Sequence, residues 1–277
     1  MNVFFNSFPI LSKKLLLRKF PVRIGAAEKV ASRQNSPISP GRFLSDIFWE
    51  SLDYKKLNSA LGDQLRVIEI GCGSGKYGDL ISKFSCISSY TGVDIQSNRN
   101  WSDFDPNQFN FVEDTYEKFE YIVDNQNLII TQSALEHFEK DLRLFRKVDD
   151  YASTSQFPVA SIHVVPSASS LFTFLWHGIR QYGKFHLRRL HLSSPNCSEF
   201  LIFTLGGLPL NWFHFKHVTI PQIFLRIPLI SQDKSAYFAE LLEAINRDIR
   251  KSSSRFSVFT AIVIFWNTGL SHESLVD

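Results

Sequence analysis

Three glycines alternate with other residues directly after a short apolar run, in the stretch VIEIGCGSG at residues 67–75. They are Gly71, Gly73 and Gly75, and an acid, Glu69, stands two residues before the first of them. Because glycine has no Cβ, such a loop lets a ligand lie directly against the backbone. The pattern predicts a strand that ends in a ligand-binding loop, and leaves open which class of ligand it binds.

Two phosphate-binding loops fit these residues poorly. A G-x-x-x-x-G-K-[ST] loop would need glycine at Ile70, and Ser or Thr at Tyr77 to hold magnesium. The dinucleotide pattern G-x-G-x-x-G matches residues 73–78, but it starts two residues beyond Gly71, where the apolar run ends. An NAD-dependent oxidoreductase therefore stays a weaker alternative.

Further polar residues follow other β-branched or apolar runs. Asp94 ends SYTGVD, Asp114 ends FNFVED, and the pair Thr131 and Gln132 ends NLIITQ. If the runs are parallel strands, their carboxyl ends meet at one edge of a sheet, where open α/β sheets bind ligands. We therefore expect these groups to lie around the glycine loop.

The elements that must position these residues alternate in type. Apolar runs predict strands at residues 66–70, 89–95, 109–114, 127–132 and 157–166, and helical spacing predicts helices at 43–57, 76–84 and 139–151. This alternation indicates βαβ units, hence a parallel sheet with helices on both faces. Beyond Pro166 we expect helices at 169–183, 193–207 and 235–251, a strand at 210–218, and a long strand within 255–267.

The acid-x-Gly-x-Gly-x-Gly pattern of residues 69–75, with Asp94, Asp114 and the segment TQSALEHF at 131–138, resembles the class I S-adenosylmethionine-dependent methyltransferases. The resemblance is to the subgroup of ubiquinone-type and small-molecule methyltransferases, and it covers residues 65–166. It implies a doubly wound α/β fold with a mostly parallel, seven-stranded Rossmann-like sheet. It also implies an antiparallel C-terminal strand at 256–266 and a helical cap insertion.

The resemblance further implies S-adenosylmethionine as the cofactor. The histidines are scattered and lack ligand spacing, so we expect no metal site. Asp94 would bind the ribose hydroxyls and Asp114 would bind the adenine amino group. The oxidoreductase alternative does not explain an acid at Asp114. The implied cofactor-binding residues are Glu69, Gly71, Cys72, Gly73, Gly75, Asp94, Ile95, Asp114, Thr115, Thr131 and Gln132.

A hydroxyl acceptor also needs a base, and histidine can take a proton near neutral pH. His137, beside Glu136, is the first candidate, His163 the second and His177 the third. The implied reaction is transfer of a methyl group to an oxygen by in-line displacement. A methyltransferase-like binding module without transfer activity is the second hypothesis.

We divide the chain into a basic N-terminal extension and linker (1–41), a cofactor-binding core (42–166), an aromatic and basic acceptor cap (167–234), and a closing helix and strand (235–277). The cap combines aromatic side chains with Arg180, Lys184, Arg188, Arg189 and Lys216. This composition suits an anionic, partly apolar acceptor, such as a small molecule or a glycan-linked or lipid-linked intermediate. Peripheral contact with an anionic membrane is a second interpretation.

Net charge, cysteine spacing and the length of the apolar runs limit the classes of partner and the cellular location that we expect. The net charge of +3 is small, and the segment 131–138 lacks the Asn/Asp-Pro-Pro-aromatic motif of base-amino methylases, so nucleic acid is a disfavoured partner. The three cysteines have neither zinc-site nor disulfide spacing. No apolar run reaches the ~18 residues of a membrane span. We expect a cytoplasmic protein whose basic residues 1–33 form a flexible or loosely docked extension, with a surface helix or a transit peptide as alternatives.

Overall fold

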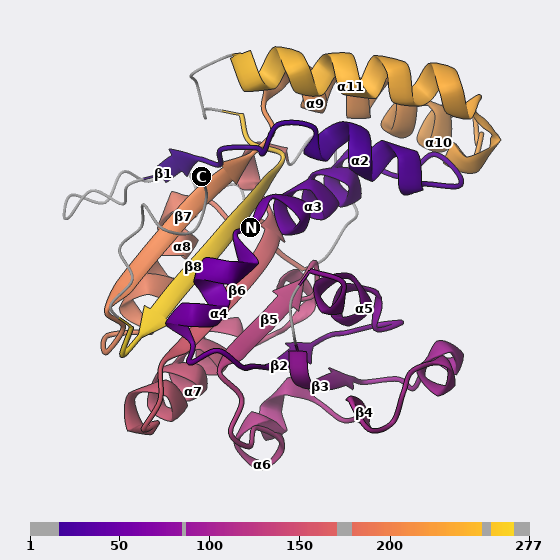
Figure 1. The fold of residues 1–277 in the computed structure, drawn as a ribbon. Helices are drawn as coiled ribbons and strands as arrows, with labels where there is room; N and C mark the ends of the chain where they lie inside the picture. Colours follow the sequence, from indigo (N-terminus) through magenta and orange to yellow (C-terminus); the bar gives the residue numbers. More distant parts are fainter. Residues whose placement is uncertain (1–16, 85–86, 171–178, 251–255, 269–277) are drawn as a thin grey trace.

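The computed structural model describes residues 17–84, 87–170, 179–250 and 256–268. Its centre is one eight-stranded sheet with the spatial order β1-β7-β8-β6-β5-β2-β3-β4 (Figure 1). The strands are β1 (Leu17–Lys19), β2 (Leu65–Ile70), β3 (Ile87–Asp94), β4 (Phe109–Glu113), β5 (Leu128–Gln132), β6 (Val159–Pro166), β7 (Glu199–Leu205) and β8 (Phe259–Trp266). All neighbours pair in parallel except β8, which is antiparallel to both β6 and β7.

This topology confirms the predicted doubly wound sheet with an antiparallel C-terminal strand. Two strands were not expected at their positions: β1 comes from the N-terminal extension and pairs with β7 at the sheet edge, and β7 itself lies where a helix was expected. The chain runs outward from β2 to β4 on one side and through β5 and β6 on the other. The point where the strand order reverses therefore lies between β2 and β5, which is where such sheets bind ligands.

Helices cover both faces of the sheet. The helices of one layer contribute buried residues to a first core cluster. They are α2 (Ala26–Arg33), α3 (Pro40–Ser51), α4 (Tyr54–Ala60), α5 (Lys76–Ser82), α9 (Leu208–His214) and α11 (Lys234–Arg250). The other cluster contains residues of α6 (Phe119–Ile122), α7 (Asp141–Thr154) and α8 (Lys184–Leu192). Central strands face both clusters: Val67 belongs to the first and Ile68 to the second. Such strands read as continuous apolar runs because neither face meets water.

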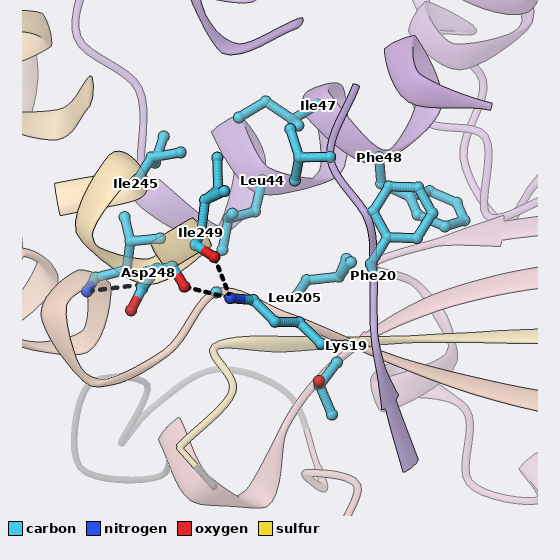
Figure 2. Close-up of a pocket in the computed structure, with 13 residues that line it drawn as sticks. Lys19, Phe20, Leu44, Ile47, Phe48, Leu205, Ile245, Asp248 and Ile249 are labelled. Carbon is cyan, nitrogen blue, oxygen red and sulfur yellow. Dashed lines mark hydrogen bonds between the residues drawn. The ribbon is translucent and has the colours of Figure 1, made fainter. Parts of the chain in front are cut away.

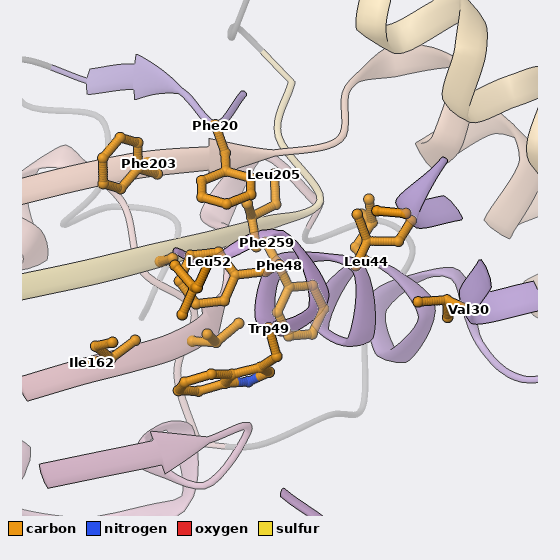
Figure 3. Close-up of a cluster of buried hydrophobic side chains, with 14 of the residues drawn as sticks. Phe20, Val30, Leu44, Phe48, Trp49, Leu52, Ile162, Phe203, Leu205 and Phe259 are labelled. Atoms are coloured by element: carbon orange, nitrogen blue, oxygen red, sulfur yellow. The ribbon is translucent and has the colours of Figure 1, made fainter. Parts of the chain in front are cut away.

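Helix α3 anchors the first layer to the site. Ser39 caps its start by accepting a hydrogen bond from the backbone N–H of Arg42, and Pro40 follows at the first turn. Figure 3 shows Phe48 of α3 in one buried cluster with Leu205 and Phe259 of the sheet, with Trp49 on the side toward Ile162. The indole N–H of Trp49 donates to the side-chain oxygen of Gln132 at 2.8 Å, so α3 is fastened to the end of β5.

The N-terminal extension is firmly docked wherever the structure describes it. Lys19 donates to the backbone carbonyls of Asp248 and Ile249 at the end of α11 (Figure 2). Its neighbour Phe20 is 3% exposed, with its ring centroid 4.8 Å from that of Phe48. The prediction of a flexible or loosely docked extension is therefore wrong for residues 17–33.

Three predicted elements differ from the structure. The segment 193–207 was expected to be a helix, but it contains the strand β7, which is buried along most of its length. A buried strand without alternation cannot be told from a buried helix by periodicity. The segment 210–218, expected as a strand, lies instead in α9 and the π-helical turn Phe215–Thr219. The helix expected at 43–57 is interrupted between α3 and α4.

The aromatic helix expected at 169–183 falls largely on residues 171–178, which lie outside the described part of the chain. The remaining helix is α10 (Ile220–Phe224). In the described part of the chain, no helix is long and apolar enough to cross a membrane.

Candidate cofactor site

A cavity of about 640 Å³ lies at the carboxyl ends of β2, β3, β4 and β5, at the point where the strand order reverses. Six of the residues singled out from the sequence line it: Gly71, Asp94, Ile95, Asp114, Thr115 and His137. The cavity volume falls within the ~300–1,000 Å³ of small-molecule sites. The strand ends thus bring together groups that lie up to 66 positions apart in the sequence.

The glycine loop forms the side of the cavity next to β3. The backbone N–H groups of Gly71 and Cys72 both donate to the carbonyl of Val93, at 2.7 and 3.1 Å. Gly71 has a φ of 77°, and a Cβ there would lie 2.3 Å from the Cβ of Ala134. Glycine is therefore required twice at this position, for the left-handed backbone and for the close approach of the loop after β5.

The carboxylate of Asp94 joins the loop to the end of β3. Its Oδ2 accepts a hydrogen bond from the backbone N–H of Gly73 at 2.7 Å. The carbonyl of Gly73 in turn accepts from the indole N–H of Trp101 at 2.8 Å, and the Trp101 ring stacks on Phe111. A Cβ on Gly73 would meet nothing within 4 Å, so open space adjoins the loop at this point.

Asp114 supplies the second carboxylate of the cavity. It accepts hydrogen bonds from the backbone N–H of Thr115 at 2.7 Å and from Lys118 at 3.0 Å. These two interactions hold the pKa of Asp114 below its usual value, so the group is charged at neutral pH. Its neighbour Tyr116 stacks on Phe138 with ring centroids 4.3 Å apart, and both rings line the same cavity.

Glu69 lies beneath the loop and does not line the cavity. It is 1% exposed and accepts a hydrogen bond from the hydroxyl of Tyr90 at 2.5 Å. Burial raises the pKa of Glu69 to about 8, although the hydrogen bonds from Tyr90 and from the backbone of Gly78 act in the opposite direction. The contacts of Glu69 link β2 to β3 and to the start of α5, which supports the loop from below.

The remaining residues of the glycine loop do not line the cavity. Cys72 is buried, and burial raises the pKa of its thiol well above the usual value, so the thiolate is not available. Gly75 has a φ of 80° and precedes α5 as its N-cap residue. Neither Cys72, Gly73 nor Gly75 is among the residues that line the cavity.

The structure separates the candidate bases. His137 is exposed and lines the cavity, in the turn Leu135–His137 that follows β5. His163 is 1% exposed in the middle of the sheet, where its Nδ1 lies 2.9 Å from the hydroxyl of Thr131 and its ring packs against Phe145. Burial lowers the pKa of His163 to about 3. This environment favours His137 over His163, and His177 lies outside the described residues.

Thr131 and Gln132 point into the protein interior. Thr131 contacts His163, and Gln132 binds Trp49 and the hydroxyl of Ser45. The next residue, Ser133, does line the cavity, and its φ of 50° is rare for a residue other than glycine. Backbone conformations of this kind often mark functional sites.

Sequence reasoning did not assign several lining residues. Ser133 and Phe138 lie in the segment 131–138 that was singled out, but only its first two residues and His137 were given roles. Tyr116, Glu117 and Glu139 had no distinguishing pattern. Within the described ranges, no group of three or more His, Cys, Asp or Glu side chains is placed to hold a metal ion.

No protein-family model and no curated protein sequence matches this chain. Solved structures do match it. The plantazolicin methyltransferase BamL, solved with a triazolic desmethylPZN analog and SAH, superposes with a TM-score of 0.50 and 14% sequence identity. The match covers 88% of this chain and 90% of that one. The chain has the class I methyltransferase fold.

Two further solved structures are similar. A SAM-dependent methyltransferase from Archaeoglobus fulgidus has 18% identity and a TM-score of 0.47, over 76% of this chain and 90% of that one. A putative sarcosine dimethylglycine methyltransferase from Galdieria sulphuraria has 11% identity and a TM-score of 0.49, over 81% and 84%. In this class I methyltransferase fold, β4-β3-β2-β5-β6-β8-β7 form the seven-stranded sheet and β1 adds an eighth strand.

Proposed function

We propose that the protein is an S-adenosylmethionine-dependent methyltransferase that acts on a small-molecule, glycan-linked or lipid-linked acceptor, by methyl transfer to oxygen. The observation that carries the proposal is the arrangement of Gly71, Asp94 and Asp114 around one cavity at the reversal point of a class I methyltransferase fold. The neighbour BamL was solved with SAH.

The cavity suits the chemistry of this cofactor. Gly71 lets a ligand approach the backbone closely, Asp94 can accept hydrogen bonds from two hydroxyls, and Asp114 can accept from an amino group. The aromatic side chains of Tyr116 and Phe138 offer flat apolar surface beside these acceptors. Glu69, Cys72, Gly73 and Gly75 would support this site from behind the lining.

Bound S-adenosylmethionine would supply an electrophilic methyl group on a sulfonium. The protein must then hold the acceptor oxygen in line and remove its proton. We assign the removal of this proton to His137, because it is the candidate base that lines the cavity and is exposed to solvent. Thr131 and Gln132 would position the segment that carries His137, through the sheet and α3.

Peripheral membrane contact is a separate part of the proposal. Leu208, Trp212 and Leu225 are 52%, 64% and 60% exposed in and beside α9 and α10, and Trp212 lines a cavity with Lys216, which is paired with Glu240. Such side chains suit an anionic lipid surface. Flotation with vesicles of anionic and of neutral lipids tests this: binding to neither would remove membrane contact from the proposal.

The cofactor is tested by isothermal titration with S-adenosylmethionine, S-adenosylhomocysteine and NAD side by side. We expect the first two to bind and NAD not to bind. Binding of NAD alone would indicate the oxidoreductase alternative. Cofactor binding without transfer of a radiolabelled methyl group to any compound of a cell extract would indicate the silent binding module.

A further inference from the structure

A second cavity of about 640 Å³ adjoins the first one, between the start of α7 and the start of α8. Glu139 lines both cavities, so the second begins where the wall containing His137 and Phe138 ends. The two sites therefore lie side by side along the segment that follows β5. A ligand longer than one cavity can extend from one into the other.

The second cavity is strongly basic. Five of its eleven lining residues are Lys or Arg and two are Asp or Glu, so with neutral histidine the lining carries a formal charge of +3. The whole chain of 277 residues carries the same net charge. The basic residues are Lys140, Arg143, Arg146, Arg180 and Arg189.

One of the two acidic charges of this lining, that of Asp141, is already compensated within the protein. Asp141 is 2% exposed and is paired with Arg180 and with His186, whose Nε2 lies 2.7 Å away, while the hydroxyl of Tyr182 donates to it at 2.9 Å. Arg180 also donates to the backbone carbonyl of Glu139 at 2.8 Å. Asp141 therefore serves as a buried support that fixes Arg180 and His186.

Three arginines remain for a ligand. Arg143 and Arg146 are three positions apart on α7, so their side chains share one face of the helix, and Arg189 approaches from α8. Within the described ranges none of the three forms an ion pair within 4 Å of an acidic side chain. The pKa of Glu120 is lowered by its hydrogen bond from Lys147, with which it is paired, and also by the charge of Arg143. Arg189 lies over the ring of Phe185, with 6.0 Å between the guanidinium carbon and the ring centroid. Phe185 gives the cavity an apolar surface beside the charges.

We propose that this cavity, lined by Arg143, Arg146 and Arg189, binds the phosphate or carboxylate group of an anionic methyl acceptor. Guanidinium groups recognise both anions through paired N–H donors, and the cavity is large enough for an organic group attached to the anion. The inference rests on the proposed function, since the acceptor oxygen would lie in the first cavity near His137.

The anion site is tested first without any acceptor. Inorganic pyrophosphate is titrated into the protein at constant ionic strength, and the triple variant R143Q/R146Q/R189Q is compared with wild type. We expect the dissociation constant to rise about tenfold or more, because three charged donors are removed. The matched control K55Q/R226Q/K234Q also loses three positive charges, but at exposed positions outside the cavity. It should bind pyrophosphate as wild type does. Equal weakening in both triple variants would overturn the site, as would wild type binding no pyrophosphate.

Titration with S-adenosylmethionine separates this proposal from the proposed function. The R143Q/R146Q/R189Q variant should bind the cofactor as wild type does, because none of the three residues lines the first cavity. If neither protein binds the cofactor, the proposed function fails while the pyrophosphate result still decides the anion site.

The link to the acceptor is tested with a metabolite extract of the producing cells and radiolabelled S-adenosylmethionine. The labelled product should bind an anion-exchange resin, and its formation should fall in the R143Q/R146Q/R189Q variant and not in the control variant. Loss of resin binding after phosphatase treatment would identify a phosphate, and its persistence a carboxylate. A neutral product formed at an unchanged rate by the R143Q/R146Q/R189Q variant would overturn the link.

Discussion

The backbone N–H of Gly73 donates a hydrogen bond of 2.7 Å to the carboxylate of Asp94, which ties the loop after β2 to the end of β3. The other oxygen of Asp94 has only a long contact, 3.4 Å, with the backbone N–H of Gln96. A carboxylate has about four lone-pair sites, so Asp94 keeps acceptor capacity toward the cavity that it lines. One side chain can thus hold the loop and receive a ligand.

Replacing Asp94 by Ala should weaken S-adenosylmethionine binding by ~1–3 kcal/mol, or about 5- to 150-fold, because a charged acceptor is lost. Titration calorimetry measures the change. Glu113→Ala is the matched control, since Glu113 is an exposed acid opposite Asp94 on β4 that does not line the cavity. Unchanged affinity in Asp94→Ala would show that the cofactor site is assigned wrongly.

Gly71→Ala should lower the free energy of unfolding by ~2–4 kcal/mol. The left-handed backbone contributes about 1 kcal/mol of this and the clash with Ala134 the rest. Gly62→Ala separates the two effects, because Gly62 has a φ of 87° but nothing within 4 Å of an added Cβ. Urea unfolding of both variants checks the prediction. Equal destabilisation would mean that close packing against Ala134 has no role.

Glu69 should make the protein less stable as the pH rises from about 4.5 to about 8. In this window the folded protein keeps the proton on Glu69 while the unfolded chain has lost it, so raising the pH favours unfolding. Glu69→Gln keeps the shape of the protonated acid and does not titrate. The stability of this variant relative to wild type should therefore rise between pH 5 and pH 8, by on the order of a few kcal/mol. Parallel stability curves for wild type and Glu69→Gln would contradict the raised pKa.

His137→Gln should lower the rate of methyl transfer to a hydroxyl acceptor by about 10²-fold or more while cofactor affinity changes little. His163→Gln should instead reduce stability, since the ring is buried beside Thr131 and Phe145. An unchanged rate of methyl transfer in His137→Gln would exclude it as the base.

Local patterns were sufficient for the strands β2 to β6 and for the helices α5 and α7. The strands β2 to β6 were predicted correctly because each is a short apolar run followed by a turn. The helices α5 and α7 were predicted correctly because their apolar residues have helical spacing. The strand β7 was mistaken for a helix, because burial on both faces removes the alternation by which a strand is recognised. The short strand β1 has no pattern of its own and depends on pairing with β7.

The sequence by itself determined the order of the strand ends and hence the gathering of Gly71, Asp94 and Asp114, because parallel strands place their carboxyl ends at one edge. Only the tertiary structure decided which neighbouring residues face the cavity. Thr131 and Gln132 point to opposite faces of β5 and bind His163 and Trp49, whereas Ser133 follows the end of the strand with a φ of 50° and reaches the cavity. Likewise Arg143 and Arg189, which are 46 positions apart, line one cavity only because α7 and α8 pack on the same face of the sheet.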